Sequence, residues 1–320
     1  MRLRLGSAAA DATAAAGSRR LDLVTALLFA GCVVLAASNF VAVRYSNLDL
    51  PPLWGAGLRF GLAAVSYAVL VQLLKLPWLR REDMRDVLVY GVLNFGAFYA
   101  LTYWALLHVT AGTAAVVIGA VPLITLLLAV AQGLERLSAR TLIGGTLALL
   151  GVGWLTATSS AIAATPLALL ALVVAAVCLG QSIVVGKRVS RNHPASLNAV
   201  GMAVGAALLL AISVATGETW ALPSSMQSVI AVVYLVTFGS MGLFGLTILL
   251  LRRWAPSASS YVLVVVPLVT LLLESLIARV PVMLGALAGA VLVLAGTWFG
   301  ALSRASPTRS AAPGEPDLSP

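Results

Sequence analysis

The chain has 320 residues, of which 61% are hydrophobic and only 10% charged. Soluble domains contain about 45–50% apolar and about 25% charged residues, so a soluble fold of this size could not bury so much apolar surface. The sequence therefore predicts a protein whose solvent is the lipid bilayer. Its net charge of +9 does not indicate a nucleic-acid partner, because the basic residues are spread over short segments between apolar runs.

Two short segments flank the apolar part of the chain. Residues 1–20 are rich in Ala, Ser and Arg and are predicted to be a cytoplasmic leader. Ser18–Leu21 resembles the start of a twin-arginine export signal, but Asp22 departs from that pattern and the many later apolar runs argue against a cleaved signal. Residues 304–320 are rich in Pro, Ser and charge and are predicted to be a disordered cytoplasmic tail.

Ten apolar runs lie between these segments, and each approaches the length of about 20 residues that a helix needs to cross the hydrocarbon core. They cover residues 21–43, 53–74, 86–106, 111–131, 140–157, 166–186, 196–216, 227–250, 257–277 and 282–303. The expected fold is therefore an all-α membrane protein of ten transmembrane helices.

The basic residues fall on one side of this series of spans. All of them except Arg44, Arg59 and Arg279 lie in the leader, in every second loop or in the tail. Because Lys and Arg are enriched in cytoplasmic loops, this alternation predicts that both termini face the cytoplasm. We expect a multi-pass protein of the bacterial inner (plasma) membrane.

The two halves of the chain share a repeat. Val121–Leu128 reads VPLITLLL and Val266–Leu273 reads VPLVTLLL, at an offset of 145 residues that also relates Gly144 to Gly289 and Gly151 to Gly296. The sequence thus predicts two domains, with spans 1–5 over residues 21–157 and spans 6–10 over 166–303. An odd number of spans inverts the second copy, and inverted five-helix repeats are a common scaffold of secondary transporters.

Proline and glycine occupy matched places within the spans. Pro122 and Pro267 would break or bend spans 4 and 9 at equivalent depths, either as part of a binding site or only to adjust packing. Small residues spaced four apart, in Gly201–Gly205 and Gly285–Gly289, predict faces at which helices approach closely.

The sequence resembles the EamA family of the drug/metabolite transporter superfamily. The resemblance lies in SNFVAVR of span 1, LRF at 58–60, the stretch from VPLITLLL to GGTLALLGV, and its echo from VPLVTLLL to GALAGAVLVLAG. It implies ten helices in two inverted halves around a central cavity, cytoplasmic termini, and export or exchange of small metabolites such as amino acids. The family's Glu after the repeat proline is present as Glu135 but is replaced by Val280 in the second half, so we interpret Glu135 as a loop-capping residue.

Polar side chains inside the spans are the candidates for a substrate cavity. Two pairs occupy matched positions in spans 1 and 6, and three tyrosines add aromatic faces with polar tips. The candidates are Ser38, Asn39, Tyr99, Tyr103, Gln181, Ser182 and Tyr261. An unpaired amide in hydrocarbon costs several kcal/mol, so Asn39 and Gln181 should face each other, another helix or a wet cavity. Hydrogen bonding between helices is the alternative role for the whole set.

Two charged side chains lie within the predicted spans. Arg59 is about two turns into span 2 and Glu274 about one turn from the outer end of span 9. They are candidates for proton coupling or for a gate, since ionisable residues in spans are costly and commonly functional. Alternatively, Glu274 forms a structural pair with Arg59 or with Arg279 of the adjacent loop.

Motifs for catalysis are absent from the sequence. It contains no H-E-x-x-H and no Walker A motif, which argues against a metallopeptidase and an ATP-driven pump. We therefore expect no enzyme, metal or cofactor, but a secondary transporter, either an exporter or an exchanger, that works by alternating access. Its expected partners are the bilayer, a small-molecule substrate and coupling protons, and the protein would be a monomer or a homodimer. An uptake permease and a non-transporting scaffold or receptor remain the alternatives.

Overall fold

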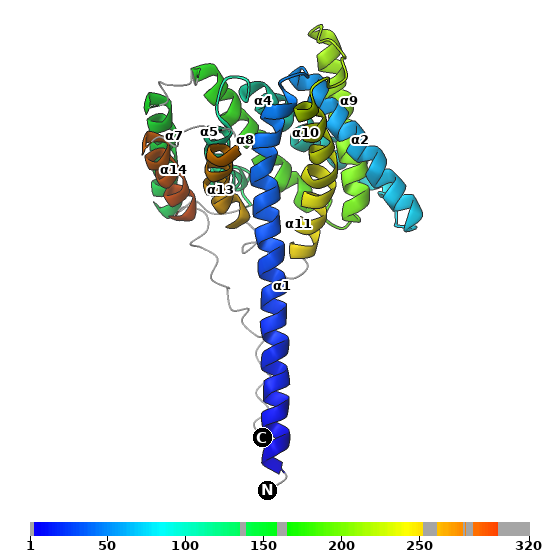
Figure 1. The fold of residues 1–320 in the computed structure, drawn as a ribbon, viewed down its shortest axis with the longest axis vertical. Helices are drawn as coiled ribbons and strands as arrows, with labels where there is room; N and C mark the ends of the chain where they lie inside the picture. The colour runs from blue at the N-terminus through cyan, green and yellow to red at the C-terminus, as the bar shows by residue number, and fades with distance from the viewer. Residues whose placement is uncertain are drawn as a thin grey trace, which may run out of the picture.

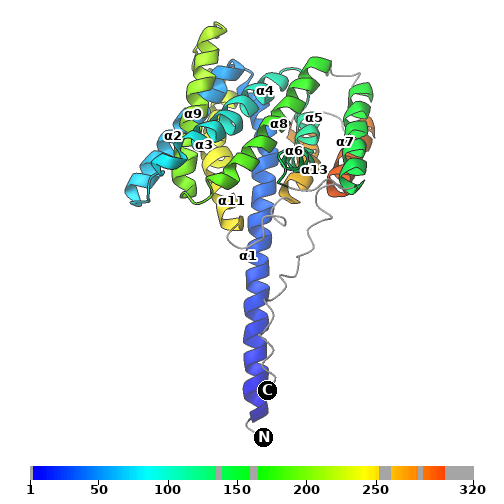
Figure 2. The same cartoon turned by 180° about the vertical axis from the view of Figure 1, so that it is seen from behind.

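The computed structural model describes residues 3–134, 139–158, 165–251, 261–277, 279 and 284–299, which form helices joined by loops and contain no strand. The elements are α1 (Leu3–Ser46), α2 (Pro52–Leu73), η1 (Arg81–Asp83), α3 (Met84–Gly91), η2 (Val92–Ala97), α4 (Phe98–Ala105), α5 (Ala111–Ile118), α6 (Val121–Ala131), α7 (Ala139–Thr158), α8 (Pro166–Arg188), α9 (Pro194–Ala215), α10 (Met226–Val236), η3 (Thr237–Gly242), α11 (Leu243–Leu251), α13 (Tyr261–Ile277) and α14 (Leu284–Thr297). Each of the ten predicted runs coincides with one or more of these elements. They form a bundle from which the first half of α1 extends (Figure 1, Figure 2).

Seven stretches of the described residues are long and apolar enough to cross a membrane. They are Leu23–Ser46, Pro52–Leu73, Arg81–Ala105, Ala111–Ala131, Pro166–Arg188, Pro194–Ala215 and Met226–Thr247. Two shorter apolar helices cover Val265–Ile277 and Leu287–Thr297. The chain is therefore a multi-pass helical membrane protein.

Helix starts follow local sequence signals. Proline occupies the first turn of α2, α6, α8 and α9, where its missing N–H costs no helical hydrogen bond. Thr110, Thr165 and Ser225 precede α5, α8 and α10, and their side-chain oxygens accept a backbone N–H from the first turn. These caps fix the loop positions from which the helices enter the bundle.

Three helical segments are interrupted within the bundle. η2 and η3 are π-helical and lie at the same 145-residue offset as the sequence repeat. π-Helical turns are rare and often occur near functional sites. The segment 111–131 is broken at Gly119–Ala120, with Pro122 in the first turn of α6. α13 instead continues through Pro267, so a break is present in one half only, and a bend at Pro267 stays a prediction.

Glycines allow two helix pairs to approach closely. α2 packs along α9, and α7 packs along α14. A Cβ on Gly151 of α7 would lie 2.9 Å from the Gly289 carbonyl of α14, and one on Gly296 would lie 2.5 Å from the Gly144 carbonyl. Gly205 of α9 packs directly against Phe95. The predicted role of Gly205 in helix packing is thus confirmed.

Candidate functional site

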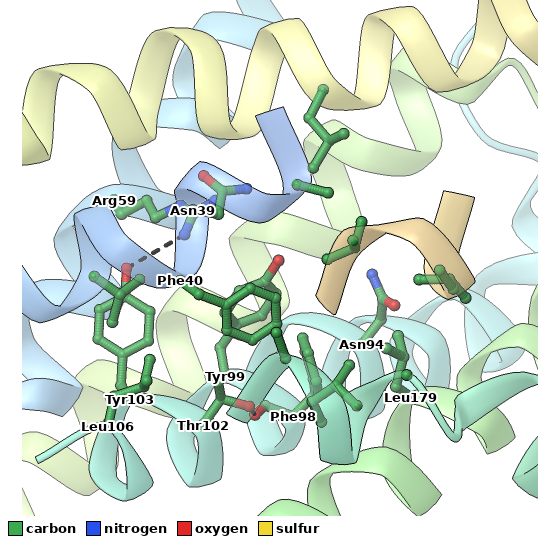
Figure 3. Close-up of a pocket in the computed structure, with 18 of the residues that line it drawn as sticks. Asn39, Phe40, Arg59, Asn94, Phe98, Tyr99, Thr102, Tyr103, Leu106 and Leu179 are labelled. Carbon is green, nitrogen blue, oxygen red and sulfur yellow. Dashed lines mark hydrogen bonds between the residues drawn. The ribbon is translucent and has the colours of Figure 1, made fainter. Parts of the chain in front are cut away.

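A cavity of about 200 Å³ lies within the bundle and is lined by both halves of the chain (Figure 3). Its polar lining residues all come from the first half and are Asn39, Arg59, Asn94, Tyr99, Thr102 and Tyr103. Its apolar wall includes Phe40 and Phe98 from the first half and Leu179, Phe244 and Val266 from the second. The cavity thus has a few polar side chains in a largely apolar wall.

Arg59 is the charged group of this cavity. α2 carries it about 10 Å from the start of that helix, and only 1% of the residue is exposed. Its Nε donates to Ser240 Oγ at 3.0 Å, its Nη2 to the Gly239 carbonyl at 3.0 Å and its Nη1 to Tyr103 Oη at 3.4 Å. Figure 3 marks the bond to Tyr103. The guanidinium also lies 5.3 Å from the centre of the Tyr99 ring, a cation–π distance.

Every hydrogen-bond acceptor of Arg59 is electrically neutral. Among the described residues no carboxylate lies within ion-pair distance of its guanidinium. Buried charges in proteins are normally paired, because removing an ion from water costs several kcal/mol. The cavity therefore has an unbalanced positive charge at its polar end.

Asn39 lies beside Arg59 and is also incompletely satisfied. Its Nδ2 donates to the Gly239 carbonyl at 3.1 Å, whereas its Oδ1 has no partner although the residue is only 8% exposed. A Cβ on Gly239 would approach Asn39 Oδ1 closely and lie 3.3 Å from Arg59 Nη2. Glycine at position 239 therefore allows Asn39 and Arg59 to pack directly against the backbone of η3.

The other end of the cavity contains a second polar contact. Ser182 of α8 is fully buried and donates to Asn94 Oδ1 of η2 at 3.0 Å. Asn39 of α1 makes the corresponding contact with Gly239 of η3. Both contacts therefore join a straight helix to a π-helical segment, and both π-helical segments border the same cavity.

The predicted cavity residues divide into two groups. Asn39, Tyr99 and Tyr103 line the cavity, and Ser182 reaches it through Asn94. The remaining predicted residues are Ser38, which bonds to Tyr234 Oη in a separate groove, Gln181, which accepts from Gln132 Nε2 at 2.9 Å, and Tyr261, whose side chain lies outside the described residues. Asn39 and Gln181 do not face each other, because Asn39 bonds to Gly239 and Gln181 bonds to Gln132.

Glu274 lies away from the cavity and is fully engaged. Only 3% of its side chain is exposed, and Oε1 accepts from Arg44 Nη1 at 2.6 Å. The backbone N–H groups of Ala111 and Gly112, at the start of α5, donate to Oε1 and Oε2 at 2.8 and 2.7 Å. The alternative pairing with Arg59 is wrong, because the described partner is Arg44. Arg279 lines the same small pocket as Glu274.

Sequence reasoning missed several residues of the site. Asn94 could have been found as a lone amide in an apolar span that is related by the repeat offset to Gly239. Ser240 binds Arg59 but sits in a Gly-Ser pattern that carries no signal for this role. The approach of Arg44 to Glu274 joins residues 230 positions apart, which no local pattern indicates.

The long apolar helices define the class of the protein as a multi-pass membrane protein. The model of the EamA-like transporter family matches the chain twice, at residues 23–157 and 166–301. The chain belongs to the EamA-like transporter family.

Similar proteins carry matching descriptions. A protein of Archaeoglobus fulgidus named as an uncharacterized transporter is 28% identical over 272 residues, which cover 81% of this chain and 92% of the relative. The uncharacterized inner membrane transporter YedA of Escherichia coli K12 is 27% identical over 259 residues, covering 80% and 83%. One solved crystal structure superposes with a TM-score of 0.61 at 19% identity, over 88% of this chain and 97% of that one. This structural likeness concerns the fold.

Proposed function

We propose that the protein is a secondary transporter that exports or exchanges small metabolites, such as amino acids, by alternating access. The carrying observation is the cavity whose polar end includes Arg59 and Asn39 and whose wall is built from both halves of the chain. A site at the meeting point of two repeats can be exposed to either side when the halves rock against each other.

We further propose ten spans in two inverted repeats, over 21–157 and 166–303. Three observations support this arrangement. The family model matches two segments of similar length. The π-helical segments η2 and η3 keep the repeat offset. The Gly151–Gly289 and Gly296–Gly144 contacts exchange equivalent positions, as a two-fold relation between α7 and α14 requires.

The proposed orientation places both termini in the cytoplasm of the inner membrane. The distribution of Lys and Arg supports it. Arg44 and Glu274 then lie at the outer end of the bundle, and protons are a candidate coupling ion through Glu274. Reporter fusions after residues 50, 80 and 310 test the orientation, with an outside signal expected only after residue 50.

Metabolite profiling tests the transport function. Cells that overexpress the chain should accumulate a substrate outside relative to cells with an empty vector. Leu179→Trp would fill the cavity and abolish this accumulation. Leu167→Trp on the same helix is the matched control, because Leu167 is 61% exposed on the surface of the bundle. Identical profiles in all four strains would contradict export, and accumulation inside the cells would indicate uptake.

A further inference from the structure

Two arginines meet at the end of the bundle that faces outward in the proposed orientation. Three basic residues depart from the cytoplasmic alternation, and one of them, Arg59, lines the central cavity. The other two, Arg44 and Arg279, line one small pocket together with Glu274. Because the other basic residues of the chain are concentrated on the cytoplasmic side, two arginines in one outer pocket indicate a partner of opposite charge.

The pocket has an excess of positive charge and of hydrogen-bond donors. Two guanidinium groups and one carboxylate line it, which leaves a net charge of +1. Arg44 Nη1 donates to Glu274 Oε1 at 2.6 Å, whereas Nε and Nη2 of Arg44 have no acceptor among the described residues, and 34% of this side chain is exposed. Arg279 is exposed and forms no ion pair within the described part of the chain. The remaining donors therefore suit a singly charged anion such as a phosphodiester.

An apolar groove continues from this pocket. It has a volume of about 320 Å³ and shares Val41, Tyr45 and Ile277 with the pocket. Both α10 and α13 pack on α1, and Figure 1 shows them on opposite sides of that helix. The groove lies over α1 between these two helices, and its wall also includes Ala42 and Ile230.

The groove extends from the pocket toward the interior of the membrane. Ser38 lines its far end and precedes Arg44 by six residues of α1, a distance of about 9 Å along the helix. The hydroxyls of Ser38 and Tyr234 share a hydrogen bond, and Ser38 Oγ also bonds to the Val34 carbonyl. Because these two hydroxyls are already satisfied within the protein, the deep part of the groove offers apolar surface to a hydrocarbon chain.

We propose that this outer face binds an anionic phospholipid of the outer leaflet. Its phosphate contacts Arg44 and Arg279, and one of its acyl chains lies in the groove along α1. Helix ends lie near the level of the headgroups, and the hydrocarbon core begins below them, so the pocket and the groove occur in the order in which a phospholipid carries its phosphate and its chains. Basic pockets between transmembrane helices are known to bind such headgroups.

This inference goes beyond the proposed transport function. The pocket and the groove share no described lining residue with the central cavity. The site therefore does not depend on what the cavity carries, and only the choice of leaflet depends on the proposed orientation. A bound lipid would contact α1, α10 and α13 together and should stabilise the outer end of the bundle.

Thermal melting of the purified protein in a nonionic detergent tests the lipid site. Dioleoylphosphatidylglycerol and dioleoylphosphatidylcholine carry the same chains, but only the first has a net negative charge. We expect phosphatidylglycerol to raise the melting temperature at a concentration about five-fold lower than phosphatidylcholine, because the pocket has a net positive charge. Equal responses to the two lipids would overturn the proposal. Stabilisation by inorganic phosphate at the same concentration would show a site for a free anion and would also overturn it.

Arg279→Gln removes one of the two charges without disturbing a described contact. We expect this variant to melt like the native protein without lipid and to lose most of the preference for phosphatidylglycerol. Lys75→Gln is the matched control, because Lys75 is also exposed, follows the end of α2 and has a similar φ of 50°, against 53° for Arg279, but lies at the other end of the bundle. An equal loss in both variants, or no loss in either, would contradict a specific site.

Ala42→Trp tests the groove by filling it with a large side chain. We expect it to weaken the response to phosphatidylglycerol, whereas Val34→Trp, on the exposed surface of the same helix and outside the groove lining, should leave the response unchanged. If Ala42→Trp fails to fold, it will melt at a lower temperature without lipid, and Arg279→Gln then decides the result. An unchanged response in a folded Ala42→Trp variant would refute the acyl-chain position.

Discussion

Arg59 and Glu274 are both almost completely buried, but their surroundings balance them differently. Glu274 accepts from one guanidinium and two backbone N–H groups, all within 2.8 Å. Arg59 contacts only neutral acceptors and borders a cavity. A fully satisfied buried charge holds elements of the fold together, whereas an unsatisfied one leaves a position for a ligand.

Two other carboxylates at the same end of the bundle resemble Glu274. Glu218 accepts from the backbone N–H groups of Leu53 and Trp54 at the start of α2. Asp49 accepts from the N–H groups of Ser224 and Ser225 before α10. Negative charge at a helix N-terminus is favourable. Glu274 is therefore one of several carboxylates that cap helix N-termini, whereas Arg59 has no opposite charge beside it among the described residues.

The largest expected effect is on transport in Arg59→Gln. We expect the rate in vesicles to fall about 100-fold, because the charged group of the cavity is lost. The thermal stability should stay equal or rise, since an unbalanced buried charge is removed. A native transport rate in this variant would show that Arg59, like Glu274, is not needed for transport.

Glu274→Gln should show the opposite pattern. We expect a loss of about 3 kcal/mol in the free energy of unfolding, because Arg44 loses its counter-ion and α5 its charged cap. Transport per folded molecule should persist with its pH dependence unchanged. The double variant Arg44→Gln/Glu274→Gln is the control and should recover part of the stability. Lost or pH-insensitive transport with normal stability would instead make Glu274 a coupling residue.

Gly151→Ala tests whether packing, without any charge, has an effect of intermediate size. The added methyl group would meet Val293 and the Gly289 carbonyl of α14, so we expect a loss of about 1–2 kcal/mol. Gly145→Ala in the same helix is the control, because nothing lies within 4 Å of its Cβ position. Equal melting temperatures for the two variants would argue against close α7–α14 packing.

The smallest effect is expected at Asp49, which lies in a loop outside the spans. Hydrogen bonds from Ser225 and Ser224 lower the pKa of its carboxyl to about 2. A lowered pKa in the folded state adds stability above the ordinary pKa, and that contribution is lost as the pH falls through about 4 towards 2. We expect the difference in melting temperature between the native protein and Asp49→Asn to shrink over this range. A constant difference would show that the contact does not depend on charge.

The sequence allowed the helices to be predicted well and the site only in part. Hydropathy located the apolar helical runs of the described residues but not the start of α1 at Leu3, which lies in the predicted leader. The repeat offset singled out Gly151 and Gly296, which form the α7–α14 contact. The site depends instead on the direction in which each side chain points around its helix and on contacts between residues that are far apart in the sequence. Ser38 and Asn39 are adjacent, yet only Asn39 faces the cavity, and the π-helical turns that help to set these phases have no clear sequence signal.

The unbalanced charge of Arg59 has a kinetic consequence. A carrier returns empty after net transport but occupied after counterflow, and only in the empty return must Arg59 pass through a closed state without a counter-charge. Counterflow of a labelled anionic substrate should therefore be faster than its net flux. In a cell, such a carrier would act mainly as an antiporter that exchanges one substrate molecule for another across the membrane.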